Sequence, residues 1–396
     1  MKFEISKRMN NVKGSAIREI FKVLADPEII SLAGGNPAPE LFPSEEMAET
    51  AYNVLKNDPV LALQYGITEG YTPLRNSVKE LLKKRENISE DFNETIIVTG
   101  GQQGIELAVK CLVNEGDCII VEEPSFVGAL NTFRSYGAKL AGVPLEDDGM
   151  SIEGLKRAIS ENKNVKMIYT IPTFQNPSGI TMSEEKRKML YEIARENNIA
   201  IIEDNPYGEL VFDGKKTPTI KSMDKDGTVI YCSSFSKILA PGMRVGFVCA
   251  HKDIISKMVV AKQVSDVHTP VITQIMANEY ITKDGFDKHI EDIRELYDHK
   301  CSVMIDAIEK YFPKQITHTT PNGGLFIWCD LNGDYDMNNI AKICTEKKVA
   351  CVPGSAFMSD QSKPCSAFRL NYSTVSDEKI LTGIKILGDV FNKLLK

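Results

Sequence analysis

Residues 231–246, "YCSSFSKILAPGMRVG", place serine hydroxyls, an amine and a guanidinium directly after an apolar run that is typical of a buried strand. A lysine that is partly desolvated at a strand end has a lowered pKa, so its neutral amine can attack a carbonyl and form a Schiff base. Lys237 is the candidate for this chemistry. Ser234, Ser236 and Arg244 could bind one anion together, since hydroxyls and a forked guanidinium suit a phosphate. Taken singly, these residues also fit a surface lysine and serine caps.

A second set of anion-binding groups lies in "TGGQQG", which contains Gly101 and Gln102. Glycines let backbone N–H groups approach a phosphate, and a helix that starts near Gln102 directs its positive end at the same point. The segment is neither a GxxxxGK loop nor a GxGxxG fingerprint, so it does not predict a nucleoside triphosphate or dinucleotide site.

A phosphate site beside a Schiff-base lysine predicts pyridoxal 5'-phosphate as the cofactor. Its ring nitrogen needs a carboxylate partner, and Asp204, just after "IAII", is the candidate. Tyr207 could bond the phenolic oxygen of the ring, and Phe126 could stack on its face. "EDNPY" also fits a simple turn, and a phenylalanine at position 126 also fits plain core.

The elements that must position these residues follow from the hydrophobic pattern. From about residue 95, short β-branched runs alternate with helical patterns, which predicts a mostly parallel sheet covered on both faces. Ligands bind beyond the carboxyl ends of the strands in such sheets. Polar or aromatic residues follow five of the predicted strands, so we expect these five loops to converge on one edge.

The 396 residues favour two domains. We expect a large cofactor-binding domain over residues 46–285 and a smaller α+β domain over residues 286–396. Residues 1–45, which are rich in glycine and proline near their end, are expected to form an arm that joins the small domain.

Composition excludes several classes of function. The net charge of -7 opposes nucleic-acid binding, and the five histidines form no HExxH or closely spaced ligand set, so we expect no metal site. The nine cysteines contain no CxxC pair and are typical of reduced thiols in a cytosol. The N-terminal residues have no apolar signal region, and no run of eighteen apolar residues follows. We therefore expect a cytoplasmic protein without nucleic-acid or membrane partners.

Seven motifs of this chain occur in the same order as in one known family. They are "LALQYGITEGYTPLR", "TGGQQGIEL", "PTFQNPSG", "EDNPYGEL", "SSFSKILAPGMRVGF", "GGLFIW" and "FRLNYS". With them the chain resembles, over nearly its whole length, the class I/II pyridoxal-phosphate aminotransferases of fold type I. The resemblance implies an α/β fold with a mostly parallel central sheet in a large domain and a smaller α+β domain. It also implies transfer of an amino group from an L-amino acid to a 2-oxo acid, with 2-oxoglutarate expected, in a ping-pong cycle.

The resemblance also implies a role for each motif residue. Lys237 matches the lysine that binds the cofactor and moves the substrate proton, and Asp204 matches the ring-nitrogen partner. Asn176 and Tyr207 match the residues that bond the phenolate oxygen. Tyr65 resembles a tyrosine that reaches the phosphate from a neighbouring subunit, which implies a homodimer. The phosphate site is matched by Ser234, Ser236, Arg244, Gly101 and Gln102.

Two positions depart from the family pattern. The phosphate loop often has a serine where this chain has Gly101, which removes one hydroxyl donor. The stacking residue is commonly a tyrosine where this chain has Phe126, which removes a polar group and keeps the stack.

Substrate recognition is implied by three further positions. Arg369, in "FRLNYS", matches the arginine that forks onto the substrate α-carboxylate, near Asn176 and Gly35. "SAIREIFK" and "ISLAGGNPAPELFP" resemble the 2-aminoadipate/kynurenine aminotransferase branch, in which Arg18 would meet a distal carboxylate. Arg18 equally fits the polar face of a helix. The expected donors are 2-aminoadipate, aromatic amino acids including kynurenine, and branched-chain amino acids.

Two other functions stay open at this point. A carbon–sulfur β-lyase would use the same lysine and aspartate, because it also begins by removal of the α-proton. A regulator that senses the cofactor would need a DNA-binding module of domain size ahead of the aminotransferase part, and only about forty residues precede that part here.

Overall fold

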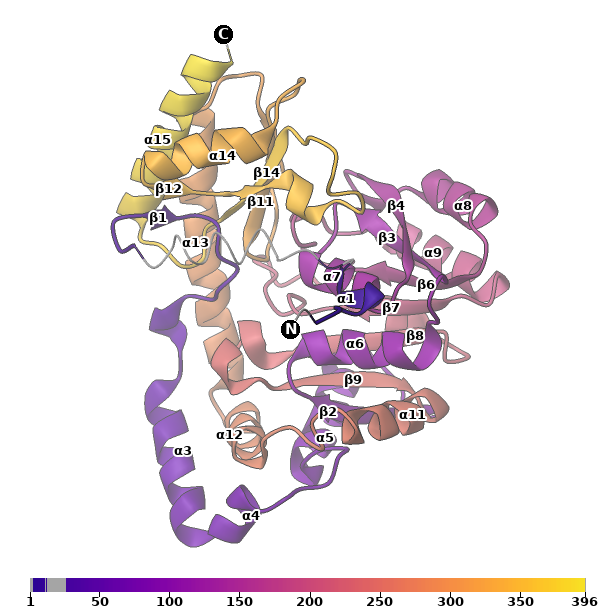
Figure 1. The fold of residues 1–396 in the computed structure, drawn as a ribbon. Helices are drawn as coiled ribbons and strands as arrows, with labels where there is room; N and C mark the ends of the chain where they lie inside the picture. The colour runs from indigo at the N-terminus through magenta and orange to yellow at the C-terminus, as the bar shows by residue number, and fades with distance from the viewer. Residues whose placement is uncertain (1–2, 11, 13–25, 396) are drawn as a thin grey trace.

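An eight-stranded sheet forms the centre of the larger part of the molecule (Figure 1). The computed structural model describes residues 3–10, 12 and 26–395. In spatial order the strands are β2 (Asn93–Val98), β9 (Gly246–His251), β8 (Val229–Ser234), β7 (Ala200–Asp204), β6 (Val165–Thr170), β3 (Cys118–Glu123), β4 (Lys139–Glu146) and β5 (Gly149–Met150).

Six of these strands run in the same direction, which confirms the predicted mostly parallel sheet. The neighbouring pairs from β8 through β7, β6 and β3 to β4 are all parallel. Strand β9 is antiparallel to both β8 and β2, so β2 shares the direction of β8. The reversal of β9 has a local cause, because residues 235–245 contain only two short 3-10 turns and no crossover helix.

Helices cover both faces of the sheet. The strands alternate their side chains between two hydrophobic clusters: Ile119 and Val121 belong to one cluster and Ile120 to the other. The first cluster includes residues of α5 (Thr72–Glu86), α6 (Gly101–Leu112), α7 (Val127–Ser135) and α11 (Lys252–Gln263). The second includes residues of α8 (Ile152–Glu161), α9 (Glu184–Glu196) and α10 (Ile220–Met223).

The C-terminal part is built on a long helix and a small antiparallel sheet. Helix α13 (Phe286–Tyr311) runs from beside the large sheet into this part and packs against α15 (Asp377–Leu394) (Figure 1). The sheet has the order β10 (Thr317–His318), β11 (Phe326–Asp330), β14 (Ala367–Asn371) and β13 (Val352–Pro353), with α14 (Met337–Glu346) and the 3-10 turn η4 (Gly354–Phe357) beside it.

The segment that follows residue 26 is attached to the C-terminal part. Strand β1 (Ile30–Ser31) pairs in parallel with β12 (Val349–Ala350). The Ala38 N–H donates a hydrogen bond of 2.9 Å to the Tyr297 hydroxyl on α13. The arm over residues 1–45 and the boundary at residue 285 stay our proposal for the domain limits.

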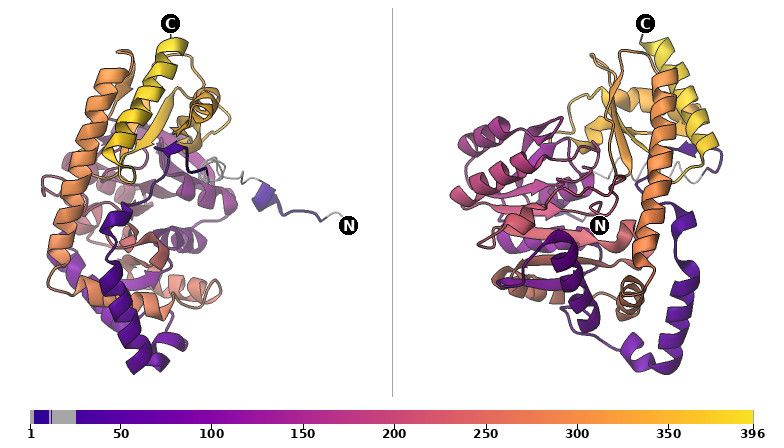
Figure 2. Two further views of the ribbon diagram at one scale, coloured as in Figure 1. Left: turned by 90° about the vertical axis from the view of Figure 1, so that its left-hand side faces the viewer. Right: turned by 180° about the vertical axis from the view of Figure 1, so that it is seen from behind.

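Three helices lie at the edge of the molecule, away from the large sheet. They are α3 (Ser44–Asn57), α4 (Pro59–Leu63) and α12 (Val271–Ile281), and the right-hand view of Figure 2 shows α3 and α4 extending from the body. The described part of the N-terminal region also contains the short helix α1 (Lys7–Asn10) and the 3-10 turn η1 (Pro39–Leu41). None of the helices that the structure describes is long and apolar enough to span a membrane. All nine cysteines are unpaired, and seven of them are buried.

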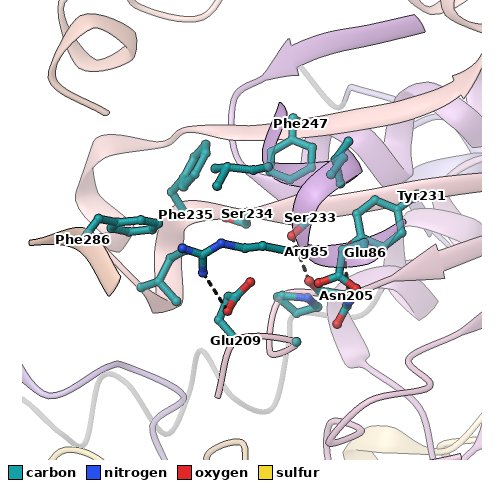
Figure 3. A pocket seen from close by; sticks show the side chains of 15 residues that line it. Arg85, Glu86, Asn205, Glu209, Tyr231, Ser233, Ser234, Phe235, Phe247 and Phe286 are labelled. Atoms are coloured by element: carbon teal, nitrogen blue, oxygen red, sulfur yellow. Dashed lines mark hydrogen bonds and ion pairs between the residues drawn. The ribbon is translucent and has the colours of Figure 1, made fainter. Parts of the chain in front are cut away.

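Glu209 connects three parts of the chain through one carboxylate. It accepts from Lys216 at 2.7 Å, from Arg85 at the end of α5 at 3.1 Å and from Arg294 on α13 at 3.3 Å. Figure 3 shows the Arg85–Glu209 pair beside a small cavity that Phe235 and other aromatic side chains line. Burial alone would raise the pKa of Glu209, but the three cations outweigh it and the pKa is lowered.

We expect Glu209→Gln to destabilise the protein by about 3 kcal/mol at neutral pH, because three largely buried cations lose their shared partner. Thermal unfolding of the cofactor-free protein measures the change. The lowered pKa means that the carboxylate stabilises the fold above its unfolded-state pKa, so the difference shrinks as the pH falls and the wild-type carboxylate also becomes protonated.

Glu192→Gln is the matched control, since Glu192 pairs with Arg195 on the exposed surface. We expect almost no change for this variant. Equal melting temperatures for Glu209→Gln and Glu192→Gln at neutral pH would contradict the connecting role of Glu209.

Candidate active site

A cavity of about 290 Å³ lies between the carboxyl ends of the large-sheet strands and the C-terminal part. Twelve of the fourteen residues predicted for the site line it. They are Gly35, Gly101, Gln102, Phe126, Asn176, Asp204, Tyr207, Ser234, Ser236, Lys237, Arg244 and Arg369. They come from loops after five different strands, from the N-terminal segment and from β14, so no single element could have assembled them.

Lys237 ends the 3-10 turn that follows β8, which directs its side chain into the cavity. Its Nζ donates a hydrogen bond of 2.7 Å to the carbonyl of Gly35. Desolvation lowers the pKa of Lys237 to about 8, and the positive charges of Arg369 and Arg244 act in the same direction. At pH 7 roughly a tenth of this amine is therefore neutral and nucleophilic, a far larger share than for an ordinary lysine.

Asp204 ends β7, the neighbour of β8, and is buried. Its Oδ2 accepts a hydrogen bond of 2.7 Å from the hydroxyl of Tyr169 on β6. The pKa of Asp204 is raised to about 7, mainly by burial; the Tyr169 bond opposes this rise and the nearby Glu122 adds to it. A cation in the cavity would restore the ionised form, so the site suits a protonated ring nitrogen.

Tyr207 and Asn176 form a hydrogen-bonded pair on the wall of the cavity. Asn176 Nδ2 donates to the Tyr207 hydroxyl at 3.4 Å, and Asn176 Oδ1 accepts from Arg369 at 2.7 Å. Burial raises the pKa of Tyr207 well above its usual value, so its hydroxyl stays protonated and can donate to an anionic oxygen.

Arg369 is held between two aromatic rings. Its guanidinium lies 4.2 Å from the ring centroid of Phe326 and 4.9 Å from that of Phe357. One Nη donates to the Ala33 carbonyl at 2.7 Å, whereas the buried Nε has no hydrogen-bond partner among the described residues. Burial lowers the pKa of Arg369 to about 10, so it remains positive at neutral pH. A carboxylate would supply both the missing acceptor and the missing counter-charge.

The anion-binding side of the cavity combines a glycine turn, two serines and Arg244. Gly100 has φ +79°, and a Cβ there would lie 2.2 Å from Arg244 Nη2, so the turn requires glycine. Helix α6 begins directly after it and presents its N-terminal amides. Ser234 Oγ donates to Ser236 Oγ at 2.8 Å, and Arg244 donates to the Thr99 carbonyl at 3.2 Å.

Gln102 and Phe126 also line the cavity, and they provide different groups to a ligand. The amide of Gln102 donates to the Gly128 carbonyl and to Thr132 on α7, at 3.1 and 2.6 Å, so only its backbone N–H is available for an anion. Phe126 precedes α7 and borders the cavity with its half-buried ring, which suits stacking.

The two remaining predicted residues do not line this cavity. Tyr65 is 81% exposed and packs edge-on against His268, with 5.8 Å between the ring centroids. Arg18 lies outside the described residues.

The structure adds residues that the sequence interpretation did not name. Asn36 and Phe326 line the cavity, and both belong to motifs already recognised, "GGNPAP" and "GGLFIW". Ile105, Ile171 and Pro206 complete the lining. Tyr169 and Phe357 carried no signal in the sequence, because their contacts with Asp204 and Arg369 arise only from the pairing of strands and the packing of the two parts.

Comparison with known proteins identifies the family. The profile described as "Aminotransferase class I and II" matches residues 27–387. The chain belongs to this aminotransferase family. It is similar to aromatic-amino-acid aminotransferase 1 of Thermococcus litoralis, with 40% identity over 99% of this chain and 94% of the relative. It is also similar to 2-aminoadipate transaminase of Thermus thermophilus, with 36% identity over 98% and 96%.

The solved structures agree with this assignment. The kynurenine aminotransferase of Pyrococcus horikoshii, solved in complex with PMP, has a TM-score of 0.94 and 40% identity, covering 99% of this chain and 98% of that one. The class I/II aminotransferase family, the fold type, the enzyme class and pyridoxal phosphate as the cofactor are thus confirmed. The relatives also support the predicted aminoadipate/kynurenine branch.

The lowered pKa of Lys237 predicts how the cofactor-free aminotransferase reacts with pyridoxal. Attack requires the neutral amine, so the second-order rate constant should rise with pH and level off with a midpoint near pH 8. Stopped-flow absorbance over a pH series measures it. Lys237→Met should lack this phase, and a midpoint above pH 10, as for an ordinary lysine at about 10.4, would contradict the desolvation argument.

Proposed function

We propose that this protein is a cytoplasmic, homodimeric aminotransferase. It transfers the amino group of an L-amino acid to a 2-oxo acid, with 2-oxoglutarate as the main acceptor, in a ping-pong cycle. One observation carries the proposal: the nucleophilic amine of Lys237 and the buried, incompletely bonded guanidinium of Arg369 line the same cavity.

The lining residues fit pyridoxal 5'-phosphate. Ser234, Ser236, Arg244 and the first amides of α6 would bind its phosphate, and the negative charge of Asp204 would keep its ring nitrogen protonated. Asn176 and Tyr207 would donate to its phenolate oxygen, and Phe126 would cover one face of the ring. When bound, this cofactor supplies an electron sink that acidifies the α-proton of an attached amino acid.

Lys237 has two tasks in this proposal. Its Nζ holds the cofactor between turnovers, and once the substrate amine replaces it, the same Nζ removes the α-proton and later returns a proton. A base works best when its pKa lies near the working pH, and the pKa of about 8 satisfies this.

Arg369 would bind the substrate α-carboxylate. The rings of Phe326 and Phe357 restrict the guanidinium plane, so a bidentate contact forms with little further loss of freedom. Asn176 already bonds Arg369 at 2.7 Å and would border the same carboxylate, as would Gly35, which lines the same cavity.

A partner subunit is proposed to cover the surface around α3 and α4. This surface exposes seven large apolar side chains, which is more than monomers usually leave in contact with water. They are Tyr52, Leu55, Val60, Leu61, Leu63, Tyr65 and Ile67. In the homodimer Tyr65 would reach the phosphate of the partner subunit.

The preferred donors are proposed to be 2-aminoadipate, aromatic amino acids including kynurenine, and branched-chain amino acids. The relatives support the first two classes, since they are described as aromatic, 2-aminoadipate and kynurenine aminotransferases. Arg18 is our candidate for binding a distal carboxylate.

An assay of the holoenzyme with 2-oxoglutarate tests the proposal. Glutamate should form from each donor class, and Arg18→Ala should lower kcat/KM for 2-aminoadipate by roughly tenfold or more while leaving leucine nearly unchanged, because only the former has a second carboxylate. Equal losses for both donors would reject the role of Arg18. No glutamate from any donor would reject the aminotransferase assignment for this chain.

Product analysis separates transfer from carbon–sulfur cleavage. With a cysteine conjugate as the donor, the aminotransferase should need a 2-oxo acid in every turnover. Sustained release of a thiol and pyruvate in the absence of any 2-oxo acid would favour the β-lyase.

A further inference from the structure

Lys262 on α11 is a buried cation that the proposed reaction does not use. Its side chain is 0% exposed, and it does not line the cavity. Desolvation lowers the pKa of Lys262 although its partner Asp266 raises it. An apolar side chain of similar length would fill the same space at a smaller desolvation cost, so packing alone does not account for a lysine here.

The amine of Lys262 is bonded to the back of the anion-binding turn. Nζ donates to Gln103 Oε1 at 2.6 Å and to the two carboxylate oxygens of Asp266 at 2.9 and 3.0 Å. The same Gln103 Oε1 accepts the backbone N–H of Thr99 at 2.8 Å. Nζ also donates to the Thr99 hydroxyl at 3.4 Å, so Lys262 reaches Thr99 both directly and through Gln103.

Three further side chains, those of Asp266, Thr269 and Arg244, form polar contacts with Thr99. Its hydroxyl donates to Asp266 Oδ2 at 2.7 Å and lies 3.0 Å from the hydroxyl of Thr269. Its carbonyl accepts from Arg244 at 3.2 Å. Because Gly100 follows Thr99 and α6 begins at the next residue, the position of Thr99 sets the direction of the first amides of α6 and the reach of Arg244.

We propose that Lys262 is a positioning residue for phosphate: through Gln103 and Asp266 it holds Thr99 so that the α6 amides and Arg244 are aligned before the phosphate arrives. The inference rests on the proposed function, since it assigns a task to the same cofactor site. It concerns only the phosphate, because the hydrogen bonds of Lys262 go to Thr99, Gln103 and Asp266 and to none of the described residues proposed to bind the ring.

The test compares pyridoxal 5'-phosphate with pyridoxal, which lacks the phosphate. Dissociation constants of both for the cofactor-free full chain are measured by visible absorbance at one pH. We expect Lys262→Met to weaken binding of the phosphorylated compound by about tenfold, the loss typical of a misaligned supporting group, and to leave pyridoxal binding unchanged. If Lys262→Met weakens binding of both compounds equally, or weakens binding of neither, the proposal is overturned.

Lys221→Met is the matched control. Lys221 is also 0% exposed and pairs at 2.7 Å with an aspartate three residues away, Asp224, but its amine donates to the Val229 carbonyl at the start of β8 instead of to the anion-binding turn. Its replacement should lower the melting temperature and keep the ratio of the two dissociation constants at the wild-type value. A changed ratio in this control would mean that general destabilisation explains the effect, and the role of Lys262 would be rejected.

A variant with unchanged charge separates misalignment of Thr99 from loss of the lysine charge. It also provides a second test if Lys262→Met does not fold. Gln103→Met removes the acceptor shared by Lys262 and the Thr99 amide without changing the net charge. It should also weaken pyridoxal 5'-phosphate selectively. An unchanged ratio in Gln103→Met would overturn the positioning role. A wild-type protein that binds both compounds equally would instead contradict the proposed phosphate site itself.

Discussion

The parallel pairing of β7 with β8 determines where the reactive groups of the site lie relative to one another. Asp204 pairs with Cys232, two residues before Ser234, so the carboxylate and the first phosphate-side hydroxyl end side by side on neighbouring strands. Lys237 follows within one 3-10 turn. A register shift of one residue would turn Asp204 to the opposite face of the sheet, because side chains alternate along a strand.

The electrostatics of the cavity follow from this arrangement. Desolvation raises the pKa of Asp204 to about 7 and lowers those of Lys237 and Arg369 to about 8 and 10. Each charged form is thus disfavoured until an opposite charge enters. A ligand with a cationic ring nitrogen and anionic groups elsewhere would relieve all three groups at once, which is why a buried site of this composition selects a zwitterionic or multiply charged ligand.

The sequence predicted the fold class and most of the lining because strands, turns and loop chemistry are local. Asp204, Tyr207, Ser234 and Lys237 all follow a predicted strand, and a parallel sheet brings such positions together. Tyr169, Phe357, Lys262 and Glu209 could not be found in this way. Their roles depend on which strand is the neighbour, or on how α11 and α13 pack, and no local pattern in the sequence reports those contacts.

The proposed mechanism depends on Lys237 as the attachment point of pyridoxal 5'-phosphate. The most direct measurement is borohydride reduction of the reconstituted protein, followed by peptide mass spectrometry. We expect a phosphopyridoxyl group on the peptide that contains Lys237 and on no other peptide in comparable amount. Labelling of a different lysine, or no stable label at saturating cofactor, would contradict it.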